Sequence, residues 1–344
     1  MSEVTFPAFS VEGSGTSKRS AFTQPYALAG RLILIDAADA ELRDLLCAHF
    51  AAWHIERIEQ RNPIEPRVTI SVTRDSAPAK PENLEPFSVA SGGTCYTDAT
   101  SYFFSNDGAV VQADASAPRV HIWLTEECLQ DRVAMSEVIF NATMAALRRC
   151  GLYELHAAGV VAPNGGGVLI IGPSGSSKST LATHLAAAGW KYLSDDTLLL
   201  HESSGNIEAR ALRRVFALTN DTFDAFDNLQ ISEATIAPFD PQKMRFEPRT
   251  VFPEGFTASC RPTALFFSRV AREVTSTTRA LSRTETLAQL LRMCPWACYD
   301  KPTARAHLHV LSELARQARG FELSAGRDLF GDPQYASRFL LTAQ

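Results

Sequence analysis

Residues 167–180 read GVLIIGPSGSSKST, and this stretch decides the fold of the surrounding chain. The apolar run Gly167–Ile171 is typical of a buried strand, and a helical pattern, Leu181–Ala188, begins directly after the quoted residues. A strand, a glycine-containing turn and a helix N-terminus in this order form a phosphate-binding loop, because backbone N–H groups and the positive end of the helix face the anion. The stretch therefore predicts a nucleoside triphosphate as the ligand.

The spacing of Gly172, Gly175, Lys178 and Ser179 fits such a loop, in which the lysine reaches the outer phosphates and the hydroxyl holds Mg²⁺. Ser177 stands where glycine is usual. The backbone there is often left-handed, which costs about 1 kcal/mol for a residue with a side chain. This departure favours weaker nucleotide binding or a loss of catalysis. We expect the triphosphate to be bound by Gly172, Pro173, Ser174, Gly175, Ser176, Ser177, Lys178, Ser179 and Thr180.

The composition is that of an ordinary globular protein. A length of 344 residues suits two domains, and 45% hydrophobic with 21% charged residues excludes a mostly disordered chain. The net charge of −5 gives no sign of nucleic acid as a main partner. No run approaches the roughly 20 apolar residues of a membrane span, so we expect no membrane association and a cytoplasmic location. The seven cysteines lack a repeated close spacing, which predicts neither a disulfide framework nor a zinc site.

The residue pattern divides the chain into three parts. Short β-branched and aromatic runs such as Leu28–Ile35 and Val68–Val72 predict strands in the first half. Periodic apolar residues predict helices at Glu41–Trp53 and Met135–Leu147. This half contains no chemical motif, so we interpret it as a scaffold or docking domain. The predicted parts are a disordered tail at 1–24, an α+β domain at 25–150 and an α/β P-loop domain at 151–344.

The second half places candidate catalytic residues near the loop. A strand at Leu155–Val161 and the strand of the phosphate loop, joined by a Gly-rich turn, predict a hairpin. Asp195 and Asp196 follow the short strand Trp190–Leu193, and open α/β sheets bind ligands at strand ends. One carboxylate can hold Mg²⁺ and the other can accept a proton from an attacking hydroxyl, although Asp pairs are also common in turns. His156 could point at the γ-phosphate or at the acceptor hydroxyl, or it could be structural.

A group of charged residues after the Asp pair supplies further candidates. Phosphoryl transfer needs a cation beside the developing charge, and arginine is the usual one. Most such residues are nevertheless solvated surface charges, and the sequence does not separate the two kinds. The basic candidates, with one acidic candidate as a metal neighbour, are Arg210, Arg213, Arg214, Lys243, Arg245 and Glu208.

Three stretches carry a resemblance to a known family. LHAAGVV at 155–161, GVLIIGPSGSSKS at 167–179 and AGWKYLSDD at 188–196 resemble the HPr kinase/phosphorylase catalytic domain. The resemblance implies a fold like that of phosphoenolpyruvate carboxykinase, with the P-loop in a mixed sheet, and transfer of the γ-phosphoryl group of ATP to a serine hydroxyl. By position it implies catalytic roles for Asp196 as the base, for His156 and for Lys178. The metal Mg²⁺ would be held by Ser179 and Asp195.

The chain departs from this family after Asp196. The family's Glu-Ile-Arg-Gly-Leu-Gly signature is absent, and residues 208–212 read EARAL instead. The acceptor therefore need not be HPr, and the sequence does not support a reverse phosphorylase reaction. The chain is similar to divergent relatives such as lasso-peptide precursor kinases, which implies a serine-containing peptide or small protein as partner and allows a homo-oligomer. Two alternatives stay open: a nucleotide-binding regulatory or assembly protein with weak or no kinase activity, and a kinase of a small-molecule hydroxyl.

Overall fold

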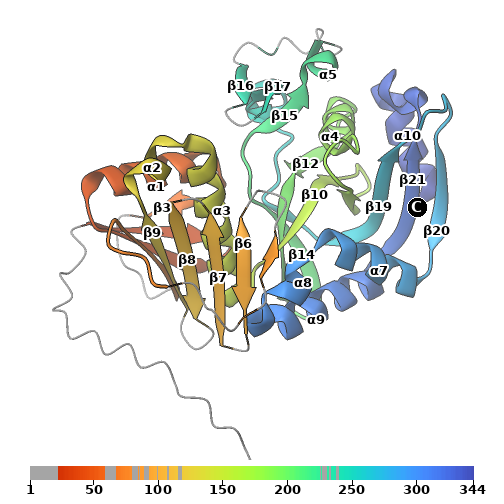
Figure 1. Cartoon of the computed structure of the whole chain (residues 1–344). Coiled ribbons are helices and arrows are strands. Elements are labelled where there is room, and N and C mark those ends of the chain that lie inside the picture. The colour runs from red at the N-terminus through yellow and green to blue at the C-terminus, as the bar shows by residue number, and fades with distance from the viewer. Residues whose placement is uncertain are drawn as a thin grey trace, which may run out of the picture.

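The computed structural model shows a mixed α/β protein with two large mixed sheets and one small sheet (Figure 1). Residues 1–21 lie outside the described part, and with them most of the tail predicted at 1–24, whereas Phe22 already begins the first strand. None of the described helices is both long and apolar enough to cross a membrane. The described residues are 22–58, 67–79, 84, 86–88, 93–98, 100–106, 108–114, 118–224, 226, 231, 234–237 and 240–344.

The first sheet lies in the N-terminal half, with the strand order β3-β1-β2-β4-β9-β8-β7-β6-β5. The pairs β2·β4 and β4·β9 are parallel and the others are antiparallel. Helices α1 (Ala40–Ala51) and α3 (Arg132–Arg149) pack on the sheet through a shared apolar core, and α2 (Glu126–Gln130) precedes α3. The strands are β1 (Phe22–Leu28), β2 (Arg31–Ala37), β3 (Glu56–Arg57), β4 (Arg67–Thr73), β5 (Phe87–Ser88), β6 (Thr94–Thr97), β7 (Ser101–Asn106), β8 (Ala109–Asp114) and β9 (Arg119–Leu124).

The single strand predicted at Leu28–Ile35 is wrong, because the structure has a hairpin there. Strand β1 ends at Leu28 and β2 begins at Arg31, and the two are antiparallel. The two linking residues, Ala29 and Gly30, have φ values of 51° and 73°. A two-residue hairpin turn with both central residues at positive φ matches the twist of the flanking strands. The predicted helices correspond to α1 and α3, which confirms them.

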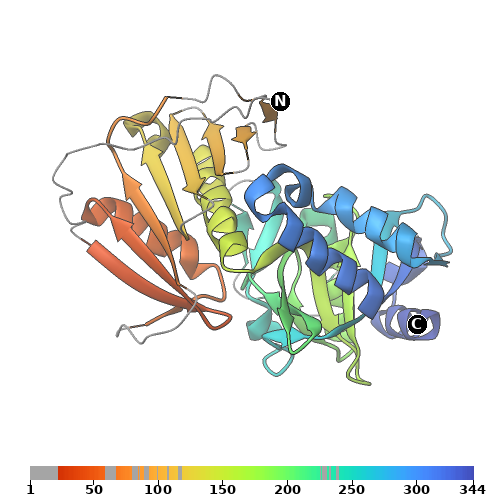
Figure 2. The ribbon, with the colours of Figure 1, turned by 90° about the horizontal axis from the view of Figure 1, so that it is seen from below.

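The second sheet has the order β18-β14-β13-β10-β11-β19-β21-β20, with β12 paired to β10. Val168 and Ile170 of β11 pack with α4 and α10, whereas Leu169 and Ile171 pack with α7 and α9 on the opposite face. Figure 2 shows the helices of the C-terminal part lying against this sheet. The strands are β10 (Tyr153–Val161), β11 (Gly167–Ile171), β12 (Lys191–Ser194), β13 (Thr197–Ser203), β14 (Asn206–Ala211), β18 (Ser259–Cys260), β19 (Pro262–Val270), β20 (Thr277–Leu281) and β21 (Arg319–Ala325). The helices are α4 (Lys178–Ala187), α7 (Arg283–Met293), α8 (Trp296–Tyr299), α9 (Lys301–Gln317), the 3₁₀ helix η2 (Arg327–Phe330) and α10 (Pro333–Ala343).

Strand directions bring the predicted site residues to one edge of this sheet. Strands β10 and β11 are antiparallel, which confirms the predicted hairpin. Strand β12 is also antiparallel to β10, so β11 and β12 run in the same direction and end at the same edge. The phosphate loop follows β11, and Asp195 and Asp196 follow β12. His156 of β10 pairs with Thr197, directly after the Asp pair.

An excursion between β14 and β18 forms the third sheet, with the order β15-β17-β16. Its elements are β15 (Phe216–Thr219), α5 (Asn220–Asp224), β16 (Thr235–Ala237), β17 (Asp240–Phe246) and α6 (Pro248–Val251). Phe216, Leu218 and Phe246 share an apolar cluster with Leu185 of α4, so this small sheet packs against the helix of the phosphate loop (Figure 1). The sequence did not predict this excursion.

The two large sheets are joined by apolar and ionic contacts. Leu152, Leu199 and Leu212 belong to the second half but pack in the core of the first sheet. Arg148 of α3 forms ion pairs with Glu154 of β10 and with Asp300, which precedes α9. The change of sheet between β9 and β10 fits a boundary near 150, and the division into domains stays a prediction.

Candidate functional site

The phosphate loop takes its shape from the end of β19. A Cβ at Gly172 would lie 2.5 Å from Oγ of Ser176 and 2.6 Å from the carbonyl oxygen of Ser268, so only glycine fits. The Ser268 hydroxyl donates to the Ser176 carbonyl at 3.0 Å. Gly175 has a φ of 78°, which glycine adopts without strain. Ser268 on the neighbouring strand β19 therefore fixes the position of the loop backbone.

Ser177 has the left-handed backbone that was expected at this position, with φ 68° and ψ 17°. It is the N-cap residue of α4, yet its side chain makes no capping hydrogen bond. The hydroxyl thus does not offset the cost of the left-handed conformation, which is about 1 kcal/mol for a residue with a Cβ.

Ser177→Gly is expected to raise the free energy of unfolding by about 1 kcal/mol, because glycine adopts this backbone without a steric cost. Denaturant titration measures the change, and calorimetry measures the affinity for a non-hydrolysable ATP analogue. Ser204→Gly is the matched control, since Ser204 also has a positive φ of 50° but lies in the β13–β14 turn. Equal affinity gains in both variants would contradict a specific role of Ser177 in the loop.

Lys178 is the first residue of α4, and its side chain is buried. Its ammonium donates to the carbonyl oxygens of Gly172 at 2.8 Å and Pro173 at 2.9 Å, and it lies 3.0 Å from Nε2 of His156. These contacts use all three donors of the ammonium. Burial lowers the pKa of Lys178, although the neighbouring carboxylates oppose the shift. To bind an outer phosphate, the ammonium must exchange carbonyl contacts for phosphate oxygens.

Asp196 lies at the centre of a chain of polar contacts. Its Oδ1 is 3.1 Å from Nδ1 of His156, and its Oδ2 is 3.3 Å from Nε of Arg213. The Thr197 hydroxyl donates to Oδ2 at 2.9 Å. The Asp196 side chain remains 29% exposed, so a substrate group can reach it. The contacts thus link Lys178, His156, Asp196 and Arg213 in one row.

The charges in this row favour an ionised Asp196 and a neutral His156. Burial of the carboxyl opposes ionisation, but Arg213, His156 and Lys178 lower the pKa of Asp196 to about 2. Burial lowers the pKa of His156, while Asp196 opposes that shift. A neutral imidazole satisfies both of its neighbours, since Nε2 accepts from Lys178 and Nδ1–H donates to Asp196.

Asp195 and Ser179 bring together a carboxylate and a hydroxyl, which are both groups that bind Mg²⁺. Asp195 is 1% exposed, its Oδ2 accepts from the Ala217 N–H at 2.9 Å, and the Ser179 hydroxyl also bonds to its carboxyl. Burial and the charge of Asp196 raise the pKa of Asp195 to about 6. A bound cation would stabilise the ionised carboxylate of Asp195 against its burial and against the charge of Asp196. Asp195 and Ser179 therefore fit a Mg²⁺ site.

The described residues alone do not supply a full set of metal ligands. Within the described ranges, no group of three or more His, Cys, Asp or Glu side chains could hold a metal ion. Mg²⁺ usually binds through one or two carboxylates and completes its six ligands with substrate phosphates and water. The site therefore fits a cation that arrives with the phosphates.

Lys243 and Arg245 of β17 bring further positive charge to the site. The charge of Lys243 contributes to the lowered pKa of Lys178. Burial and the charge of Arg213 lower the pKa of Arg245, whereas Asp195 and its neighbour oppose the shift. The small third sheet thus places basic side chains beside the Asp pair.

The remaining charged candidates have other partners. Glu208 and Arg210, both on β14, form an ion pair with each other at 3.0 Å. Arg214 pairs with Glu247 at 3.4 Å. These three side chains therefore form ion pairs elsewhere, whereas Arg213 contacts Asp196 directly.

Sequence reasoning missed the contribution of the N-terminal half. Phe140 of α3 lies under the guanidinium of Arg213, and Trp53, just after α1, forms a backbone bridge with Arg213. His49 of α1 has its pKa lowered by burial and by the charge of Arg213. In the sequence these three residues look like ordinary members of helical apolar faces, so no local signal marks them.

Comparison with known proteins finds likenesses among solved structures. No family model and no curated protein matches the chain. A solved structure of the HPr(Ser) kinase/phosphatase from Coxiella burnetii is similar with a TM-score of 0.33 and 12% sequence identity, covering 55% of this chain and 89% of that chain. At this TM-score the likeness carries no argument, and the case for a function lies in the geometry of the site.

Proposed function

We propose that this protein is an ATP- and Mg²⁺-dependent kinase that transfers the γ-phosphoryl group to a serine hydroxyl of a small protein or peptide. The observation that carries the proposal is the row of contacts from Lys178 through His156 to Asp196 beside the phosphate loop. The choice of a serine hydroxyl rests on the sequence resemblance alone.

The loop and Lys178 would bind the triphosphate, since backbone N–H groups at a helix N-terminus and a buried ammonium are suited to phosphate oxygens. Ser179 and Asp195 would hold Mg²⁺, which neutralises phosphate charge when bound. These assignments rest on contacts among the described residues.

Asp196 would orient the acceptor hydroxyl and take its proton. A carboxylate with a pKa near 2 is a weak base, but it is ionised throughout the neutral range. In a loose phosphoryl-transfer transition state the hydroxyl proton is lost late, so orientation matters more than basicity. Arg213, 3.3 Å from Asp196, adds positive charge where negative charge develops.

Two observations favour a second candidate, a nucleotide-binding regulatory protein without efficient turnover. All three donors of Lys178 are already used, and Ser177 carries the cost of a left-handed backbone. Nucleotide binding would then rearrange the loop, and the rearrangement would be the signal. A kinase of a small-molecule hydroxyl is the third reading, and free serine as a competing acceptor tests it.

The experiment that tests the proposal is transfer of label from γ-labelled ATP with Mg²⁺ to serine-containing peptides. Lys178→Met is expected to weaken binding of Mg²⁺·ATP by about 10- to 100-fold, because charge-assisted hydrogen bonds contribute about 1.5–3 kcal/mol. Calorimetry gives the affinity. Lys191→Met on the exposed part of β12 is the matched control and should leave it unchanged.

The outcomes separate the candidates. Label in a peptide supports the proposed kinase, and label in free serine alone supports the small-molecule kinase. If the wild type binds Mg²⁺·ATP but labels neither acceptor, the kinase proposal fails and the regulatory protein remains.

A further inference from the structure

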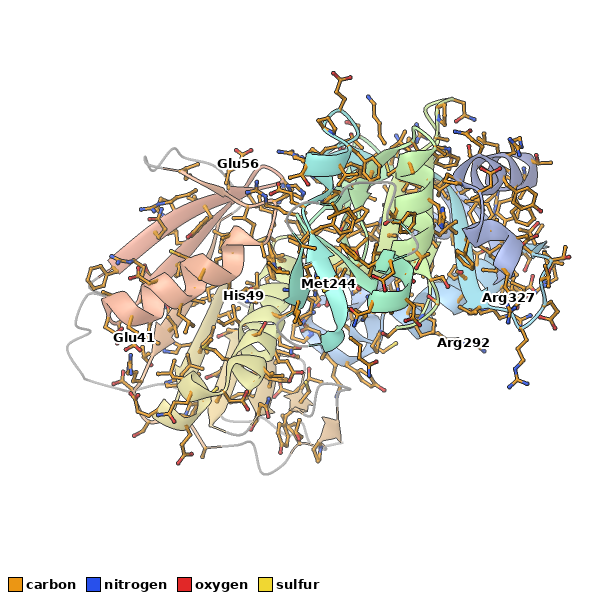
Figure 3. The ribbon with its side chains drawn as sticks, turned by 90° about the horizontal axis from the view of Figure 1, so that it is seen from above. Glu41, His49, Glu56, Met244, Arg292 and Arg327 are labelled. Atoms are coloured by element: carbon orange, nitrogen blue, oxygen red, sulfur yellow. The ribbon has the colours of Figure 1, made fainter. Side chains whose placement is uncertain are left out.

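Three aromatic side chains of the N-terminal half pack together beside the proposed site. His49 and Trp53 have ring centroids 5.0 Å apart, and Trp53 and Phe140 have centroids 6.0 Å apart. The guanidinium carbon of Arg213 lies 5.9 Å from the Phe140 centroid. We call His49, Trp53 and Phe140 the aromatic platform. Figure 3 shows that His49 lies on the side of α1 that faces β17, where Met244 is labelled.

The backbone around Arg213 is tied to the same region. The His54 N–H donates to the Leu212 carbonyl at 2.7 Å, and the Arg214 N–H donates to the Ala52 carbonyl at 2.9 Å. These two hydrogen bonds flank Arg213 and form an isolated antiparallel bridge. The segment that carries Arg213 is therefore fixed to the N-terminal half by main-chain contacts as well as by packing.

The platform supports a guanidinium without adding charge to it. Trp53 is buried and the Phe140 ring offers its π-system to Arg213. Burial and the charges of Arg213 and Arg245 lower the pKa of His49 to about 4, so the imidazole is neutral near pH 7. On its other side the guanidinium meets Asp196, which completes a defined position for the cation.

We propose that the N-terminal half is a positioning domain of the phosphoryl-transfer site, in which the aromatic platform and the backbone bridge between Trp53 and Arg213 hold Arg213 against Asp196. The effect of this positioning on catalysis rests on the proposed function. His49, Trp53 and Phe140 are positioning residues, because they act through Arg213. The active site is thus built from both halves of the chain.

A double-mutant cycle in the full-length chain tests this role. Arg213→Met is expected to lower kcat by about 10²-fold, and Trp53→Leu by about tenfold, with the KM for ATP nearly unchanged in both. Because Trp53 acts through Arg213, the double variant should have the kcat of Arg213→Met alone. Trp53→Phe, which keeps an aromatic ring, should recover most of the wild-type kcat.

Leu42→Ala is the matched control. Leu42 is fully buried in the same apolar core as Trp53, but it lies near the N-terminal end of α1, whereas Trp53 follows the C-terminal end of that helix. All variants are measured where their melting curves show a folded protein. Leu42→Ala should leave kcat unchanged in the folded fraction. Equal losses of kcat in Leu42→Ala and Trp53→Leu, or additive losses in the double variant, would overturn the positioning role.

Hydrogen exchange separates this proposal from the proposed function. The amides of His54 and Arg214 should lose protection in Trp53→Leu and keep it in Leu42→Ala, whether or not an acceptor is known. If exchange changes as expected but the wild type transfers no label, positioning stands and the kinase proposal fails. Unchanged protection in Trp53→Leu overturns the positioning proposal on its own.

Discussion

Asp196→Asn is expected to lower kcat for phosphoryl transfer by about 10³-fold, because the variant loses the carboxylate that both orients the acceptor hydroxyl and takes its proton. Asparagine keeps the shape of the side chain and can still contact His156 and Thr197, but it cannot take the acceptor proton. Lys178 and the loop are intact in this variant, so the affinity for Mg²⁺·ATP should not weaken. Removal of a negative charge beside the phosphates should strengthen it slightly.

The measurement combines transfer of label from γ-labelled ATP with calorimetric binding of the nucleotide. Asp221→Asn on α5 is the control, because it removes the same charge from an exposed residue of the nearby excursion. A wild-type kcat in Asp196→Asn would move the proton acceptor to another group and contradict the role proposed for Asp196. A parallel loss of nucleotide affinity would instead mean that Asp196 is a binding residue.

Arg148→Met is expected to lower the free energy of unfolding by about 3–5 kcal/mol, which is typical for removing one partner of a buried ion pair. Arg148 is 2% exposed, and its Nε donates to Asp300 at 2.7 Å while Nη1 pairs with Glu154. Its guanidinium also lies 5.1 Å from the Trp296 ring. Methionine fills much of the volume but leaves two buried carboxylates with less compensation.

The loss should depend on pH. In the wild type, burial raises the pKa of Glu154 although Arg148 opposes the shift, and Arg148 and Arg149 hold the pKa of Asp300 low against its burial. Without Arg148 both folded-state pKa values rise above their unfolded values. Protonation then favours the folded variant as the pH falls, so the loss should be smaller at about pH 5 than at about pH 8.

Urea titrations at both pH values measure this difference. Arg338→Met is the control, since Arg338 is 68% exposed and pairs with Asp332 at 3.7 Å. It should not change the unfolding midpoint. A loss in Arg148→Met that is as small as in this control would mean that the two halves do not depend on the buried ion pairs.

Local patterns were sufficient to predict the strand, the turn and the helix around Lys178. The loop, its strand and its helix are contiguous, and their order implies the geometry that the structure shows at Lys178. The hairpin before the loop and the Asp pair after a strand were also predictable, because turn residues and short apolar runs mark strand ends. The left-handed backbone of Ser177 followed from its place in the loop.

Other features had no local signal. The β15–β17 excursion has no clean periodicity, and the hairpin at Ala29 and Gly30 depends on two positive φ values rather than on composition. Arg213 was one of several basic candidates with equal standing in the sequence. Only its backbone bridge to Trp53 and its contact with Asp196 distinguish it from Arg210 and Arg214.

The sequence by itself determined the strand, turn and helix that contain Lys178 and Ser179, because these residues lie next to one another in the chain and their backbone geometry is local. The tertiary structure alone decided which cation reaches Asp196 and that the N-terminal half supplies the support for it. Trp53 and Arg213 are far apart in the sequence and meet only when the first and second sheets pack together. Such contacts are set by the burial of whole apolar faces, and no short stretch of residues encodes them.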